Sequence, residues 1–309
     1  MRLSHAKLPQ KAPLLFERQR QLLMLLDALG GRARNVDFQK LLFLYCQEPG
    51  AGAGYEFVPY KYGAFSFTCY ADRRKLVERG LLADDEQNWQ LTDHGKAIAG
   101  QALDFQISAF AWGHRNLRGD ALVAETYRRF PYYATRSEIA GSVLRGDTNA
   151  LEQIEAARRV PTTAALSTIG YEGRTLESYL NEILRAGATL LCDVRRNPIS
   201  RKYGFSKSTL AKACDGVGIR YEHVPELGIA SEQRQNLETQ ADYNALFAVY
   251  ERKSLPRQGD TLEKIRGWVR SGARVALTCY ERLPQQCHRH CVAEALERRV
   301  GSGLAAVHL

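Results

Sequence analysis

The sequence predicts an α/β protein: a Rossmann-like parallel sheet forms the C-terminal domain, and an α-helical, winged-helix-like domain precedes it. Two observations predict the sheet. From Leu166 onward, short apolar runs alternate with helical segments, and polar side chains follow the runs directly. A third observation, an N-terminal series of helices ending in a polar hairpin, predicts the first domain. We expect a winged-helix-like domain at 1–100, a helical bridge at 101–160 and the α/β domain at 161–309.

The N-terminal segment predicts two helices before the first aromatic stretch. Leucines recur with helical spacing over residues 14–29, and Gly30-Gly31 ends that helix. Asn35 is a suitable N-cap for the second helix. The aromatic-rich segment 55–67 lacks a clear period, and we interpret it as a loop.

A third helix carries the cations Arg73, Arg74 and Lys75 and is followed by a turn, a hairpin and the motif Leu-Thr-Asp-His-Gly. This order is that of a winged helix, whose second or third helix enters the major groove of DNA. We therefore expect these cations to contact phosphates or base edges. A protein-binding winged helix with a solvated basic face is the alternative. Residues 55–95 also resemble the N-terminal domain of antitoxin and phage-associated proteins called Panacea domains.

Residues 100–160 have helical character, and the polar segment 147–163 is the expected domain boundary. The C-terminal part predicts strands and helices in alternation. The expected strands are 165–170, 189–194, 219–224 and 275–277, and the expected helices are 175–186, 206–216, 241–253 and 261–271. A last helix is expected to carry Cys287, His288, Arg289 and His290 in its first turn.

Four short motifs occur in order in this part of the chain. They are Ile-Gly-Tyr-Glu-Gly-Arg (169–174), Asp-Val-Arg-Arg-Asn-Pro (193–198), Pro-Glu-Leu-Gly (225–228) and Cys-Tyr-Glu…Pro…Cys-His-Arg (279–289). With these motifs, residues 166–298 closely resemble the bacterial domain of unknown function DUF488. The resemblance implies a Rossmann-like domain. A few relatives in phage-defence settings are associated with modified DNA bases, which implies a DNA glycosylase.

The strand ends bring together the candidate catalytic residues Asp193, Glu281, Tyr171 and Glu172, because carboxyl ends of parallel strands meet at one crevice. An ionised carboxylate beside a sugar stabilises an oxocarbenium-like transition state or activates water. We therefore expect cleavage of an N-glycosidic bond, with Asp193 or Glu281 as the working carboxylate. The expected phosphate-binding residues beside them are Arg195, Arg196, Lys202, His288 and Arg289.

Several alternatives remain open at this point. Asp193 can instead form a structural ion pair with Arg195, and Glu281 one with Arg289. Cys287 near a helix N-terminus is a candidate nucleophile. A DNA-binding regulator whose α/β domain only senses a nucleotide-like ligand is the competing function. We expect no metal and no cofactor, because Cys287 and Cys291 lie four apart on one predicted helix.

Charge and composition favour a polyanionic partner in the cytoplasm. The net charge is +9, with 22 basic minus 18 acidic residues (+4) up to Val160 and 21 minus 16 (+5) after it. Both halves are basic, which favours double-stranded DNA, including modified phage DNA, as the partner. The sequence contains no apolar run long enough for a membrane span, and no apolar core of an export signal follows Met1. The cysteines are scattered, which indicates reduced thiols. The oligomeric state is left open.

Overall fold

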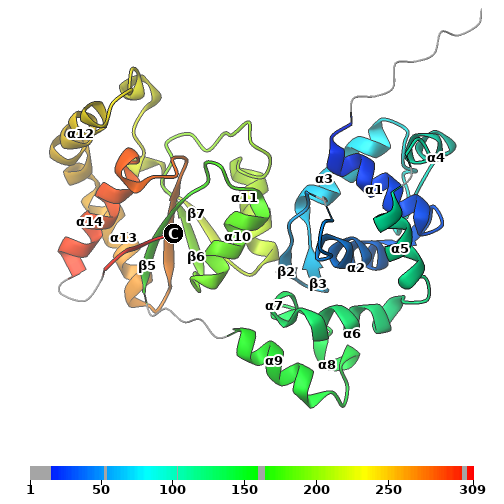
Figure 1. Ribbon diagram of the computed structural model, residues 1–309. Coiled ribbons are helices and arrows are strands. Elements are labelled where there is room, and N and C mark those ends of the chain that lie inside the picture. The colour runs from blue at the N-terminus through cyan, green and yellow to red at the C-terminus, as the bar shows by residue number, and fades with distance from the viewer. Residues whose placement is uncertain (1–14, 52–53, 103, 159–163, 301–304) are drawn as a thin grey trace, which may run out of the picture. The chain divides into compact units, whose positions relative to one another are not determined.

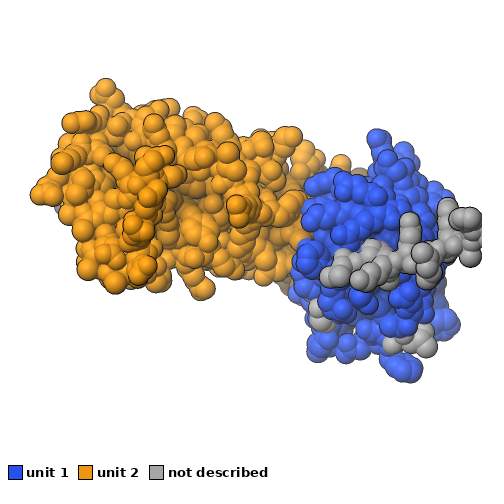
Figure 2. Space-filling view, turned by 90° about the horizontal axis from the view of Figure 1, so that it is seen from above, with its two compact units in different colours: residues 1–55, 69–122 blue, residues 56–68, 123–309 orange. Residues whose placement is uncertain are grey.

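The computed structural model describes residues 15–51, 54–102, 104–158, 164–300 and 305–309 (Figure 1). By contacts the chain forms two compact units (Figure 2): unit 1 is Met1–Tyr55 with Cys69–Leu122, and unit 2 is Glu56–Thr68 with Val123–Leu309. In the described ranges, no helix combines the length and apolar character that a membrane span requires. The division into a winged-helix-like domain at 1–100, a helical bridge at 101–160 and an α/β domain at 161–309 stays a prediction.

Unit 1 is built on helices that surround a short antiparallel ribbon. Its elements are α1 (Glu17–Ala28), β1 (Arg32–Arg34), α2 (Asn35–Cys46), α3 (Phe67–Glu78, from Cys69 on), β4 (Asn88–Gln90), α4 (Asp93–Ala99) and α5 (Phe105–Gly113). Strand β1 pairs antiparallel with β4, and an isolated bridge joins Leu82 to Leu91. The leucines of α1 are fully buried, and Phe38 of α2 contacts Trp89 of β4 with ring centroids 4.6 Å apart. Both predicted N-terminal helices are thus confirmed. The N-cap of α2 is Arg34, however, and the predicted cap Asn35 is its first helical residue.

The aromatic segment interpreted as a loop is instead a β-hairpin. Strands β2 (Val58–Tyr60) and β3 (Gly63–Phe65) pair antiparallel across a two-residue turn, and Gly63 closes the turn with a positive φ of 85°. The loop interpretation was wrong because a proline in β2 and consecutive aromatics in and around the strands hide the two-residue period. The hairpin belongs to unit 2, where Asn181 Nδ2 donates to the Phe57 carbonyl at 2.7 Å.

Residues 119–158 are largely helical, as predicted. They contain α6 (Gly119–Arg129), α7 (Pro131–Ala134), α8 (Ala140–Val143) and α9 (Thr148–Arg158). Within unit 2, the small cluster around Tyr127, Ala134 and Ile154 buries the inner faces of these helices.

A five-stranded parallel sheet forms the centre of unit 2, with strand order β7-β6-β8-β5-β9. The strands are β5 (Leu166–Gly170), β6 (Leu190–Asp193), β7 (Arg220–His223), β8 (Val275–Cys279) and β9 (Val307–His308). Four of these were predicted, and the apolar run at 275–277 extends two residues further, to Cys279. The terminal strand β9 was not predicted, because two exposed residues carry no strand pattern.

Helices cover both faces of the sheet (Figure 1). The helices are α10 (Leu176–Arg185), α11 (Lys207–Gly216), α12 (Gln240–Val249), α13 (Gly259–Arg270) and α14 (Arg289–Val300). Alternate strand residues point to opposite faces: Leu191 and Ala276 pack with α10 and α11, whereas Leu190 and Leu277 pack with α13 and α14. The predicted parallel α/β architecture is therefore confirmed, with a hydrophobic core on each side of the sheet.

Candidate active-site pocket

A pocket of about 320 Å³ opens at the carboxyl edge of the sheet. It forms there because β8 lies between β6 and β5, so that Asp193 is level with Thr278 and Gly170 with Cys279. The residues that follow these strand ends line the pocket. Its chemistry comes from the arginines Arg195, Arg196, Arg201 and Arg234, the tyrosines Tyr171 and Tyr280, and the thiol of Cys279.

Asp193 and Arg195 form a buried ion pair at this edge. Asp193 is fully buried; its Oδ1 accepts from Arg195 Nε at 2.8 Å and from the Arg195 backbone N–H at 3.1 Å. Its Oδ2 accepts from Arg195 Nη2 at 2.5 Å and from the Tyr221 hydroxyl at 2.6 Å. Burial alone would lower the pKa of Arg195, but the hydrogen bonds and charge of Asp193 raise it above its ordinary value. The carboxylate is thus ringed by donors, and Asp193 holds Arg195 in place.

Arg195 also positions the aromatic wall of the pocket. Its Nη1 donates to the Tyr171 hydroxyl at 3.0 Å and to the Phe205 carbonyl at 2.9 Å. The Tyr171 ring stacks on Phe205 at 4.3 Å between centroids and meets Tyr280 edge-on at 5.3 Å. Tyr280 is exposed, so this wall offers an aromatic surface to a ligand.

Glu281 is the second carboxylate that the structure brings to this edge. Its side chain, largely buried, forms an ion pair with Arg234, and its Oε2 accepts from Cys279 Sγ at 3.5 Å. Arg234, and not the expected Arg289, is therefore its ion-pair partner. Glu172 is not among the described residues that line the pocket, and its Oε2 accepts from the Arg282 backbone N–H at 2.9 Å. Lys202 Nζ donates to the Tyr171 carbonyl at 3.3 Å, and partial burial lowers the pKa of Lys202.

Two glycines of the motifs are required by close backbone approaches. A Cβ on Gly170 would collide with the Glu281 carbonyl, and one on Gly228 would collide with the Arg196 backbone. The Ile-Gly-Tyr-Glu-Gly-Arg and Pro-Glu-Leu-Gly motifs therefore let neighbouring segments pack against the strand ends.

His288 and Arg289 do not reach the pocket. The guanidinium of Arg289 is fully buried and donates to Thr168 Oγ1 at 3.3 Å, to the Arg282 carbonyl at 2.9 Å and to the Glu281 carbonyl. His288 is also buried, and its Nε2 contacts the Val194 carbonyl at 3.0 Å. Both residues, which were predicted to bind phosphate, thus instead contact backbone carbonyls of the segments around the site.

The start of the last helix differs from the prediction. Helix α14 begins at Arg289, after a short turn at Pro284–Gln286 (η5), and Cys287 has extended backbone angles of −138° and 130°. The assignment of Cys287 and His288 to the first helical turn was therefore wrong, because Pro284 starts a separate turn. Cys287 and Cys291 do not share one helix, so the spacing argument against a metal loses its premise.

Residues of the site that were missed from the sequence include Cys279, Arg201, Tyr221 and Arg234. Cys279 ends a buried strand in line with Gly170, and a hydrogen bond from Cys287, with the nearby Arg234 charge, lowers the pKa of its thiol despite burial. The strand 219–224 could have indicated Tyr221, since alternate residues share one face. No local pattern around Arg234 indicates its role.

In unit 1, the three cations of α3 differ in their surroundings. Arg73 donates to the carbonyls of Asp85 and Asn88 and lies over the Trp89 ring at 5.4 Å, so it holds the hairpin turn. Arg74 and Lys75 are exposed.

A family model described as "Domain of unknown function DUF488" matches residues 175–296. This part of the chain is a DUF488 domain, as the motifs predicted. The first motif, at 169–174, lies just before the matched range, and the described residues of unit 1 lie outside it. Comparisons with curated proteins and with solved structures gave no match.

Proposed function

We propose that this protein is a cytoplasmic DNA-binding enzyme whose DUF488 domain hydrolyses the N-glycosidic bond of a flipped, modified base. The supporting observation is the pocket, where four arginines converge beside an aromatic wall at the carboxyl edge of a parallel sheet. Arginines at such an edge suit the phosphates of a nucleotide, and the Tyr171–Tyr280 wall suits stacking of an extruded base.

Glu281 is our candidate for the working carboxylate. It retains 7% exposure, whereas Asp193 has none and is surrounded by donors from Arg195 and Tyr221. Glu281 pairs with Arg234, and its carboxylate can stabilise positive charge on the sugar. In this mechanism Asp193 is a positioning residue, and Tyr171 contacts the base or sugar.

Unit 1 supplies the duplex-binding surface in this proposal. The pairing of β1 with β4 and the Leu82–Leu91 bridge support a winged helix, in which α3 presents Arg74 and Lys75. These exposed cations are the proposed phosphate contacts.

A ligand sensor without catalysis is the second candidate function. It is favoured by one observation: the described residues that line the pocket include no carboxylate. Asp193 and Glu281 instead form ion pairs with two of the lining arginines, Arg195 and Arg234. A sensor binds the nucleotide and leaves DNA intact.

The deciding experiment incubates the full-length protein with normal and hypermodified phage DNA and measures released base and alkali-labile sites. We expect release from modified DNA, slowed about a hundredfold or more in Glu281→Gln because one preorganised electrostatic contact is lost. The double variant Arg196→Ala/Arg201→Ala should raise KM. Its matched control is Arg252→Ala/Arg257→Ala, which removes two exposed arginines with the same spacing outside the pocket. DNA binding without release from any substrate would reject the enzyme and favour the sensor.

A further inference from the structure

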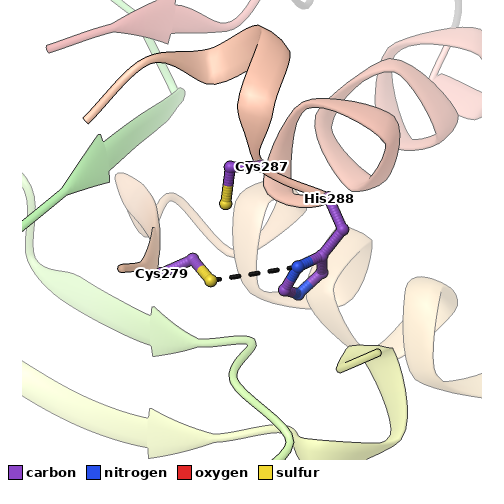
Figure 3. A group of neighbouring side chains, drawn as sticks. All are labelled: Cys279, Cys287 and His288. Atoms are coloured by element: carbon purple, nitrogen blue, oxygen red, sulfur yellow. Dashed lines mark hydrogen bonds between the residues drawn. The ribbon is translucent and has the colours of Figure 1, made fainter. Parts of the chain in front are cut away.

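Two cysteines and a histidine from two neighbouring segments converge beside the pocket. Cys279 ends β8, Cys287 follows the η5 turn and His288 immediately precedes α14. Figure 3 shows both sulfurs and the imidazole pointing toward one another. Their ligand atoms all lie within 4.8 Å of one another, and Cys279 Sγ is 3.8 Å from His288 Nδ1.

The histidine is oriented as metal-bound histidines are. Its Nε2 is 3.0 Å from the Val194 carbonyl, which can only accept a hydrogen bond, so Nε2 carries the proton. In the neutral imidazole, the lone pair is then on Nδ1, which faces Cys279. A backbone carbonyl that fixes the tautomer in this way is a usual outer partner of a zinc-bound histidine.

Size and chemistry of the cluster both suit zinc. Zn–S bonds of ≈ 2.3 Å and Zn–N bonds of ≈ 2.0–2.1 Å place tetrahedral ligand atoms about 3.5–3.8 Å apart. The Cys279–His288 distance is at the upper end of this span. Thiolate and imidazole ligands select zinc over magnesium or calcium. All three residues are at most 2% exposed. Bonds to a metal would therefore give a strong partner to His288 Nδ1, which otherwise has a weak contact with the Cys279 sulfur.

We propose that Cys279, Cys287 and His288 bind one zinc ion. Three protein ligands is the number found in catalytic zinc sites, which keep one position for water or substrate. Cys279 also lines the arginine pocket, and Glu281, whose Oε2 is 3.5 Å from its sulfur, is the adjacent carboxylate. A zinc ion bound here would therefore lie next to the pocket, with Cys279 belonging to both sites. The zinc proposal does not depend on the proposed glycosylase activity.

The test measures metal in the full-length protein purified under reducing conditions without chelators. We expect one zinc per chain by elemental analysis. After chelation, Co²⁺ should bind at one equivalent with a sulfur-to-cobalt charge-transfer band, which requires thiolate ligands. Loss of a direct ligand in Cys279→Ser, Cys287→Ser or His288→Gln should weaken zinc binding by more than the roughly 10–100-fold typical of outer partners.

Cys291→Ser and His290→Gln are matched controls, because this neighbouring Cys/His pair lies on α14 outside the cluster. Both should keep stoichiometric zinc. If a ligand variant fails to fold, the Co²⁺ spectrum of the wild-type protein still shows whether thiolates bind the metal.

Three results would overturn the proposal: apoprotein that takes up no zinc, a cobalt complex without the sulfur band, or a Cys279–Cys287 disulfide in the freshly purified protein. None of these readouts uses DNA. Zinc-loaded protein that releases no base would therefore reject the glycosylase and leave the metal site standing.

Discussion

At the scale of single residues, burial decides what the candidate carboxylates do. Asp193 receives hydrogen bonds from Arg195 and Tyr221 and has no exposed surface. A charge in this environment is costly to leave unpaired. Asp193 therefore stabilises the fold, independently of which reaction the protein catalyses. We expect its replacement to change the free energy of unfolding, so stability must be measured together with activity.

Asp193→Asn should lower the free energy of unfolding by about 3–5 kcal/mol, because it leaves the buried Arg195 charge without a counterion. Chemical denaturation of the full chain measures this. The matched control is Glu222→Gln, which breaks the exposed Arg220–Glu222 pair with the same two-residue spacing on β7. That variant should cost less than about 1 kcal/mol. An Asp193→Asn protein as stable as the wild type, yet inactive, would return Asp193 to the chemical step.

At the scale of elements, α2 contains a buried lysine that makes the stability of unit 1 depend on pH. Lys40 is 3% exposed, and desolvation lowers its pKa to about 7. In the unfolded chain, its pKa is about 10.4. Between these values the unfolded chain binds a proton that the folded protein lacks, so the free energy of unfolding rises with pH. Below the folded pKa both states are protonated, and the contribution is constant.

We expect the free energy of unfolding to increase by up to ~1.4 kcal/mol per pH unit between about pH 7.5 and pH 9.5 through Lys40. Lys40→Met should remove this increase, as seen by urea denaturation at several pH values. Lys96→Met is the control, because Lys96 is exposed on α4 and should leave the slope unchanged. Equal slopes in the wild type and Lys40→Met would contradict the prediction.

At the scale of the whole molecule, the +9 charge predicts salt-sensitive association with DNA. Each neutralised phosphate releases counterions, so the logarithm of the binding constant falls with the logarithm of salt concentration by ≈ 0.9 per contact. Arg74 and Lys75 are the exposed cations of α3.

Arg74→Ala/Lys75→Ala should therefore reduce the salt slope by about 2 and weaken binding on all duplex sequences alike. Fluorescence anisotropy of the full chain at several salt concentrations measures both. Arg252→Ala/Lys253→Ala removes an adjacent exposed Arg-Lys pair elsewhere and should change neither. If the two double variants behave identically, α3 does not contact DNA and the winged-helix interpretation loses its functional support.

The sequence by itself determined the parallel sheet, most of its helices and the DUF488 assignment. Strand and helix periods are local properties, and four ordered motifs identify the family without tertiary information. Local patterns also indicated that Tyr171, Asp193, Arg195 and Glu281 would meet, since parallel strand ends share one edge.

Only the tertiary structure decided the roles of these residues. Arg234 and not Arg289 pairs with Glu281, from a segment 47 residues earlier in the chain. Cys279 and not Cys291 lies with Cys287, because the backbone turn between β8 and α14 folds these two residues together. The hairpin at residues 58–65 likewise packs in unit 2, remote in sequence from the sheet it accompanies. Ion pairs and metal sites require their atoms to lie within a few ångströms of one another. Strand register and backbone turns determine these distances, and the periodicity of residues along the sequence does not predict them.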